Sequence, residues 1–247
     1  MHEFRSWEGY KVFVRTVTRE TRYILDGEVK EFLEVVLATC QPRILSVPLG
    51  TIYWRAQLGH EWGKALPPYE KQDAPVPFPP ARLIPLPHVA SEGRVNPKGI
   101  SCLYLACDKK TSISEVRPWV GKFVSTARFK TTKPLTLIDC SVAHSDDYVV
   151  YFDEPSPLER EQAVWRDIDR AFSQPVNPDD STAEYVPTQI LAELFRKNGF
   201  DGVMYKSCLG PGSNIALFDV STATLIDRSL YSVEGVLFSF TESGKPI

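Results

Sequence analysis

The stretch GRVNPKGISCLYLACDKKTSISEV, Gly93–Val116, decides the fold of this chain. Within it, Ile100–Cys107 alternates in side-chain character from one residue to the next, which is typical of a β-strand. Asp108 then follows as a good N-cap for a short helix. Pro118 ends that helix, because the residue before a proline is pushed out of the helical region. The stretch therefore predicts a strand that leads directly into a short helix.

Three side chains of this stretch form a candidate site. Arg94 precedes the strand, Tyr104 lies on it, and Glu115 lies near the end of the helix. A cation, an aromatic ring and a carboxylate together suit a ligand with a phosphate at one end and a cationic ring at the other. Spacing alone does not distinguish this set from a surface ion pair and a buried tyrosine.

The composition of the chain fits a globular protein. Its 247 residues are 43% hydrophobic, and 28 basic against 31 acidic residues give a net charge of −3. We therefore expect a sizeable core and no overall field that attracts nucleic acid or an anionic membrane. The longest apolar runs are too short to span a bilayer, and no apolar segment of a secretory signal follows Met1.

The cysteine count indicates the compartment. Five cysteines form an odd set without a CxxC pair. Free thiols in a reducing cytoplasm are favoured over disulfides or a zinc site, so we expect a cytoplasmic protein without a metal.

The remaining chain predicts short strands mixed with helices. Residues 3–39 have the apolar spacing of two helices, which either pack on the main domain or form a surface for a partner protein. Residues 65–97 are rich in proline and predict a long loop. Later segments predict strands, helices near 158–172 and 187–198, and two closing strands around Glu234. Without a regular βαβ repeat, the fold class is α+β.

Arg55 and the segment that follows residue 200 have two readings each. The pattern around Arg55, in YWRA, favours a surface arginine over the Trp54 ring rather than a residue of a site. Ser207 and Asn214 flank the turn in GFDGVMYKSCLGPGSNIALF and either stabilise it or bind a ligand. A serine nucleophile is disfavoured because YKSCLG lacks the GxSxG pattern.

These segments together resemble the RES-domain family of toxins, named after an arginine, a glutamate and a serine. The resemblance is carried by YWRA, GRVNPKGISCLYLA, TSISEVRP and GFDGVMYKSCLGPGSNIALF, and extends over about residues 49–240. It implies an ADP-ribosyltransferase-like core of short mixed and antiparallel strands with flanking helices. We expect residues 1–45 to be an N-terminal helical extension, as in the larger branch of that family, and residues 46–247 to be the RES domain.

The resemblance also implies roles for single residues in a reaction at the nicotinamide–ribose bond of NAD. Arg55 and Arg94 would hold the pyrophosphate, since guanidinium–phosphate hydrogen bonds are charge-assisted. The Tyr104 ring would face the nicotinamide and its hydroxyl the ribose. A carboxylate at Glu115 would oppose the positive charge that develops on the ribose. The remaining two residues, Ser207 and Asn214, would donate hydrogen bonds to ribose or phosphate.

The expected activity is cleavage of NAD by phosphorolysis or hydrolysis, with NAD as substrate, phosphate as a possible co-substrate and no cofactor. Two alternatives stay open: an ADP-ribosyltransferase that modifies a protein, and a non-catalytic module that binds NAD. The resemblance further implies a bacterial toxin–antitoxin system, in which a cognate antitoxin of the helix-turn-helix type neutralises the toxin. The sequence leaves a homo-oligomer possible and predicts no nucleic acid or membrane partner.

Overall fold

The computed structural model describes residues 3–64, 73–86, 89–144, 151–174, 182–237 and 239–240. An eight-stranded sheet forms its centre, in the order β1-β7-β8-β9-β5-β2-β6-β10. All neighbouring strands are antiparallel except β7 and β8, which are parallel. The strands are β1 (Ile44–Val47), β2 (Ile52–Leu58), β5 (Leu103–Ala106), β6 (Phe123–Thr131), β7 (Leu135–Cys140), β8 (Gly202–Lys206), β9 (Ser213–Leu217) and β10 (Ala223–Ser232).

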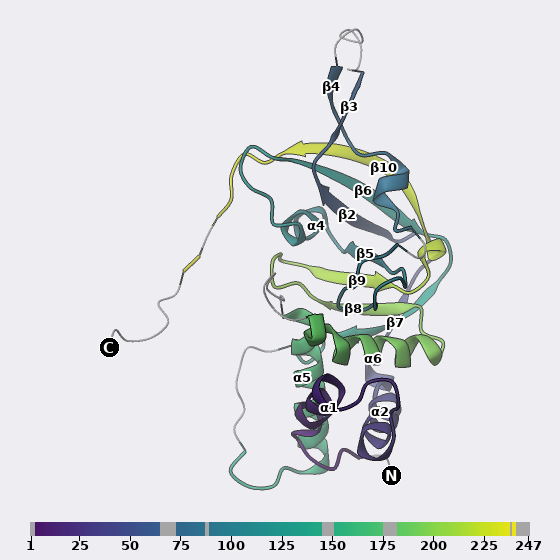
Figure 1. The fold of residues 1–247 in the computed structure, drawn as a ribbon, viewed down its shortest axis with the longest axis vertical. Coiled ribbons are helices and arrows are strands. Elements are labelled where there is room, and N and C mark those ends of the chain that lie inside the picture. Colours follow the sequence, from purple (N-terminus) through teal and green to yellow (C-terminus); the bar gives the residue numbers. More distant parts are fainter. Residues whose placement is uncertain are drawn as a thin grey trace.

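Four long helices gather at the end of the sheet that holds β7 and β8 (Figure 1). They are α1 (Gly9–Arg19), α2 (Gly27–Thr39), α5 (Pro157–Ser173) and α6 (Val186–Lys197). Three short 3-10 helices, η1 (Gln41–Arg43), η2 (Thr182–Tyr185) and η3 (Val220–Thr222), connect longer elements. A two-stranded ribbon of β3 (Glu61–Lys64) and β4 (Asp73–Val76) projects from the opposite end, near the single turn α3 (Pro80–Leu83). These elements confirm the α+β class.

The N-terminal helices form where the apolar spacing predicted them. Tyr10, Phe13 and Val17 are buried along α1 at helical spacing, and Phe32 is buried on α2. The rings of Phe13 and Phe32 stack with centroids 4.9 Å apart. Both helices belong to one buried cluster with side chains of α5, α6 and β7–β9. The boundary at residue 45 stays a prediction.

Two hydrophobic clusters lie on opposite faces of the sheet. Ile138 and Ala216 belong to the cluster under the helices, whereas their neighbours Leu137 and Leu217 belong to the other cluster. This division follows from the alternation of side chains along a strand. The helices therefore cover one face of β7–β9.

A buried ion pair ties the helices to the sheet. Arg43 Nη1 donates to both carboxylate oxygens of Asp169, at 2.8 and 3.0 Å, and to the carbonyl of Asp139 at 3.2 Å. The guanidinium also lies 4.2 Å from the centroid of the Trp165 ring. Asp169 additionally accepts from the backbone of Ala143, so each carboxylate oxygen has at least one donor.

Two predictions from the sequence are wrong in part. The proline-rich segment is not a continuous loop, because β4 pairs with β3 and places Pro75 opposite Trp62. A proline fits such a ribbon where its missing N–H is not needed for pairing. The C-terminal segment forms one strand, β10. Val233 still exchanges backbone hydrogen bonds with Gly121 and Lys122, and residues 234–237 belong to no strand. The rest of the predicted loop and tail, 65–72, 87–88, 238 and 241–247, lies outside the described residues.

Candidate active site

A cavity of about 230 Å³ opens where β2, β5, β8 and β9 meet α4 (Lys109–Glu115). It is lined by Trp54, Arg55, Ala56, Tyr104, Leu105, Ala106, Ser112, Glu115, Val116, Tyr205 and Asn214. Four of the six predicted site residues therefore come together here. Of the other two, Ser207 reaches the site through Glu115, and Arg94 lies elsewhere.

Helix α4 is fixed at its start, which sets the place of Glu115 at its end. The Asp108 carboxylate accepts from the backbone N–H of Thr111 at 2.8 Å, so the predicted N-cap is confirmed. Thr111 Oγ1 in turn accepts from the backbone of Gly212 at 2.9 Å. A Cβ at Gly212 would lie 2.2 Å from Asp108 Oδ2, so only glycine fits this contact. The turn after β8 is thereby docked on α4.

The two residues that flank this turn both hold Glu115. Ser207 Oγ donates to Glu115 Oε1 at 2.6 Å, and Asn214 Nδ2 donates to the same oxygen at 2.7 Å. Ser207 is 4% exposed and Asn214 7%. Ser207 Oγ also accepts from the backbone N–H groups of Leu209 and Gly210. Their hydrogen bonds thus go to the carboxylate and the turn, whereas the sequence analysis predicted contacts with ribose or phosphate.

Arg55 enters the cavity with an unused donor. Its Nη1 donates to the backbone carbonyl of Tyr104 at 2.9 Å, but its buried Nε has no partner among the described residues. Burial lowers the pKa of the guanidinium from its usual value to about 10, so it still carries its charge at neutral pH. In the part of the chain that the structure describes, the cations over the Trp54 ring are Arg128 and Lys109, each 5.9 Å from the centroid, and the predicted contact of Arg55 with this ring is not found there.

Tyr104 lines the cavity, and its hydroxyl is bonded to the loop that precedes β5. The hydroxyl donates to Asn96 Oδ1 at 2.6 Å and accepts from the Val95 N–H at 3.0 Å. Burial raises the pKa of Tyr104 well above its usual value, so the phenol stays neutral. The hydroxyl would have to give up its hydrogen bond to Asn96 before it could donate to a ribose, as the sequence predicted.

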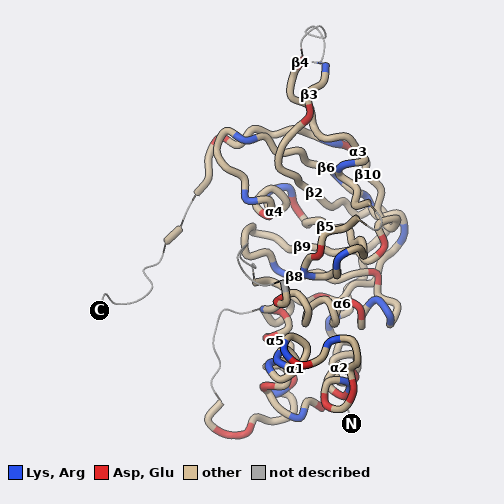
Figure 2. The backbone as a smooth tube through the Cα atoms, in the orientation of Figure 1, with Lys and Arg blue, Asp and Glu red and all other residues tan. Residues whose placement is uncertain are grey.

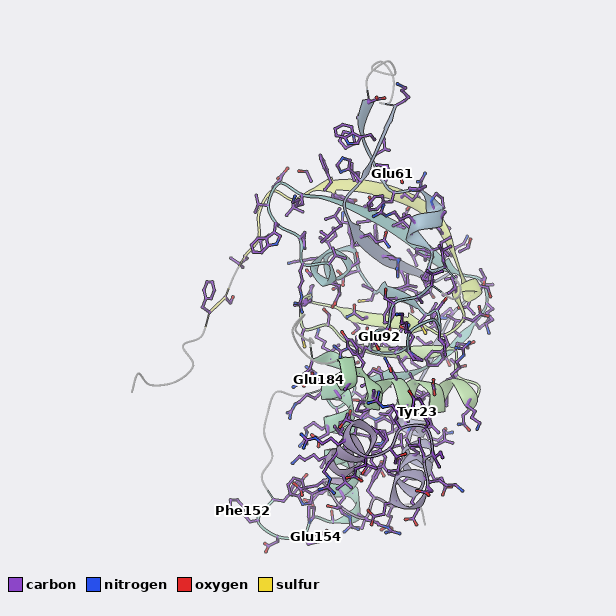
Figure 3. The ribbon with its side chains drawn as sticks, in the orientation of Figure 1. Tyr23, Glu61, Glu92, Phe152, Glu154 and Glu184 are labelled. Carbon is purple, nitrogen blue, oxygen red and sulfur yellow. The ribbon has the colours of Figure 1, made fainter. Side chains whose placement is uncertain are left out.

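Arg94 points away from the cavity that Arg55 lines. Its guanidinium donates to the carbonyls of Ala171 and Gln174 at the C-terminal end of α5. It borders a separate hollow that also includes Glu184, which Figure 3 labels where η2 meets the sheet and helices. Cations at a helix C-terminus are favourable because the carbonyls there lack partners in the helix. A role of Arg94 in binding pyrophosphate stays a prediction.

The sequence analysis missed Tyr205 and Trp54 as parts of the cavity wall. Tyr205 lies on β8 opposite Asn214 of β9, and burial raises the pKa of its hydroxyl. The alternation in GVMYK was a signal for its orientation, but not for which strand lies beside it. Trp54 stood next to Arg55 in YWRA and was considered only as a stacking partner.

The described residues hold no group of three or more histidine, cysteine or acidic side chains that could bind a metal. None of their helices is long and apolar enough to cross a membrane. Figure 2 shows basic and acidic residues interspersed along the backbone, in line with the small net charge. Local geometry at the cavity therefore has to supply any affinity for an anion.

The fold and the cavity define an α+β protein with a guanidinium, an aromatic ring and an anchored carboxylate around one small hollow. The RES domain family model matches residues 52–233, and the chain belongs to this family. The crystal structure of the M. tuberculosis MbcT-MbcA toxin-antitoxin complex contains a similar chain, with 13% identity and a TM-score of 0.42. That similarity covers 80% of this chain and 92% of the other. A search among curated proteins found no match.

Proposed function

We propose that this protein cleaves the nicotinamide–ribose bond of NAD at the cavity between β2, β5, β9 and α4. The observation that carries the proposal is the buried Nε of Arg55, a donor without a partner in the same cavity as the Glu115 carboxylate. A buried donor left without a partner is destabilising, so its presence favours a ligand that supplies an acceptor. A phosphate oxygen of the NAD pyrophosphate is such an acceptor.

Glu115 is suited to the other end of the ligand. Ser207 and Asn214 fix Oε1, and among the described residues Oε2 accepts no hydrogen bond. When the bond between ribose C1′ and the nicotinamide nitrogen breaks, its electron pair leaves with the nicotinamide, which becomes neutral. The ribose is left as an oxocarbenium-like cation. A carboxylate held in advance stabilises that charge without reorganisation.

The Tyr104 ring offers a flat wall against which the nicotinamide can stack. The acceptor that then attacks C1′ is phosphate or water, which gives phosphorolysis or hydrolysis. Phosphorolysis forms a bond from phosphate oxygen to C1′, whereas hydrolysis forms one from water oxygen and releases a proton. Either reaction would deplete NAD in the cytoplasm, where we place the protein. This is the activity expected of a toxin.

A cell that contains such an enzyme needs a means to neutralise it. We therefore expect a cognate antitoxin, of the helix-turn-helix type that the family resemblance implies. Purification of this chain together with the product of the neighbouring gene, followed by an activity assay with and without that product, tests this expectation.

The activity itself is tested by incubation of the purified, partner-free protein with NAD in buffers with and without phosphate. Free nicotinamide, ADP-ribose and ADP-ribose 1″-phosphate are quantified by chromatography. Nicotinamide release without an added protein acceptor supports the proposal, and the second product identifies the attacking group. Release that depends on a protein acceptor would instead identify an ADP-ribosyltransferase, and binding without release a non-catalytic NAD module.

A further inference from the structure

We propose that Asn96 is a positioning residue, which orients the Tyr104 ring as a wall of the cavity by holding the phenol hydroxyl from behind. The inference rests on the proposed function, because it concerns how the same cavity binds NAD. It assigns the Tyr104 hydroxyl to anchoring the ring and leaves only the ring face for the ligand.

The Asn96 side chain joins the two ends of the loop 91–100 by hydrogen bonds. It is 2% exposed, and its Nδ2 donates to the carbonyls of Ser91, Pro97 and Ile100, at 2.9, 3.2 and 2.8 Å. Its Oδ1 accepts the Tyr104 hydroxyl at 2.6 Å. Both ends of the amide are therefore used, and its orientation is fixed by the loop that it closes.

Helix α6 holds the same loop from outside. Gln189 Nε2 donates to the carbonyls of Gly93 and Asn96, at 2.9 and 3.1 Å. Thr188 Oγ1 donates to the carbonyl of Arg94 at 2.7 Å. Figure 3 labels Glu92 at the start of this loop, close to α6 in the view. The acceptor for the phenol is thus carried on a rigid support that extends from the helix to the sheet.

The phenol hydroxyl fits this support closely. It accepts from the Val95 N–H at 3.0 Å while it donates to Asn96. A Cβ at Gly93 would lie 2.8 Å from the hydroxyl and 3.3 Å from Asn96 Oδ1, so a larger residue there would displace the ring. Since the hydroxyl has one hydrogen to donate and gives it to Asn96, it has none left for a ligand.

The test is a double-mutant cycle of Asn96→Ala and Tyr104→Phe, read as KM and kcat for nicotinamide release from NAD. Each single variant should raise KM by roughly 2- to 10-fold, the value of one hydrogen bond, with kcat changed less. The double variant should be no worse than the weaker-binding single one, because both changes remove the same link. Additive effects would overturn the inference, since the hydroxyl would then act on the ligand directly. Unchanged KM in both single variants would overturn it as well.

Ser125→Ala is the matched control. Ser125 Oγ is buried on β6, donates to the Gly59 carbonyl and accepts from the Phe78 N–H, and lines no part of the cavity. Its loss should lower the melting temperature without a change in KM. A KM shift as large as in the two test variants would contradict a specific role of Asn96. Should Asn96→Ala not fold, Tyr104→Phe removes the same hydrogen bond from the other side.

A second readout needs no activity. Because Val95 donates to the phenol, its amide hydrogen should exchange faster in Asn96→Ala and in Tyr104→Phe than in the unchanged protein. If the unchanged protein releases no nicotinamide but both variants exchange faster, the proposed function fails and the support of the ring by Asn96 stands. Unaltered exchange in both variants would overturn the support itself.

Discussion

Arg43 is buried and Arg55 is partly buried with a buried Nε; the two arginines lie in different parts of the molecule and differ in their hydrogen-bond partners. Arg43, at the helical end, donates to the Asp169 carboxylate and the Asp139 carbonyl and stacks on Trp165. Arg55, at the cavity, donates to the Tyr104 carbonyl, and its Nε has no acceptor among the described residues. Among the described residues, Arg43 has no buried donor without a partner, whereas Arg55 has one. We propose that a ligand supplies the missing acceptor. We infer that an arginine whose buried donors all have partners has a structural role, whereas one with an unpaired buried donor is suited to bind a ligand.

Arg43→Ala should have the largest effect, a loss of stability. The change leaves the Asp169 carboxylate buried and without its cation, which costs about 3–5 kcal/mol in the free energy of unfolding. Chemical denaturation at pH 7.5 measures the loss. If the variant is as stable as the unchanged protein, Arg43 is not a structural arginine in the sense used above.

Glu115→Gln should lower the rate of NAD cleavage and leave the fold intact. Glutamine preserves the shape but not the charge that opposes the developing cation, so we expect a loss of kcat of roughly 10²–10³. The rate of nicotinamide release gives the answer, with the melting temperature as the control for folding. Turnover at the normal rate would remove the carboxylate from the mechanism.

Arg55→Ala should affect NAD binding more than stability, which is the reverse of the effect expected of Arg43→Ala. Loss of one charge-assisted hydrogen bond should weaken the affinity for NAD by about 10- to 100-fold. Stability should fall less than in Arg43→Ala, since the variant loses the hydrogen bond to the Tyr104 carbonyl but leaves no buried carboxylate without its cation. Calorimetric titration with NAD compares Glu115→Gln with the double variant Arg55→Ala/Glu115→Gln. The Glu115→Gln background allows affinity to be measured without turnover. Equal affinities would place the pyrophosphate elsewhere.

Arg94→Ala distinguishes between the two roles for a third arginine. The contacts with the Ala171 and Gln174 carbonyls predict a loss of stability of about 1–3 kcal/mol. The predicted pyrophosphate role instead requires weaker NAD binding. Denaturation and titration on the same variant separate these outcomes, and a loss of affinity without a loss of stability would show that Arg94 leaves α5 to bind the ligand.

A further expected effect is a pH dependence of stability at Asp169. Burial raises the pKa of this carboxyl to about 6, against the partial compensation by Arg43. Between about pH 4 and pH 6 the folded state therefore keeps a proton that the unfolded state has released. Stability from this group is present at the low end of that window and is lost as the pH rises through it. Across this window the free energy of unfolding of the unchanged protein should fall with rising pH relative to that of Asp169→Asn. If the two free energies change with pH in parallel, the pKa of Asp169 is not raised.

The sequence predicted the elements whose causes are local. The spacing of Tyr10, Phe13 and Val17 predicted α1, and Asp108 predicted the start of α4. Charge and family resemblance selected Glu115, and the resemblance alone selected Arg55; the cavity contains both.

The sequence did not predict contacts that depend on strand pairing far along the chain. That Ser207 and Asn214 donate to one oxygen of Glu115 follows from the place of β9 between β8 and β5. The attachment of Arg94 to α5 likewise joins residues about 80 positions apart. Periodicity carries no information about which strand or helix end lies next to a given side chain.

A time course of nicotinamide release shows whether the cavity cleaves NAD. The unchanged protein and Glu115→Gln are compared at equal concentration, in phosphate buffer and free of any partner. We predict steady release by the unchanged protein and release at least roughly 10²-fold slower by the variant. Intact NAD after prolonged incubation with the unchanged protein, or equal release by both, would contradict the account.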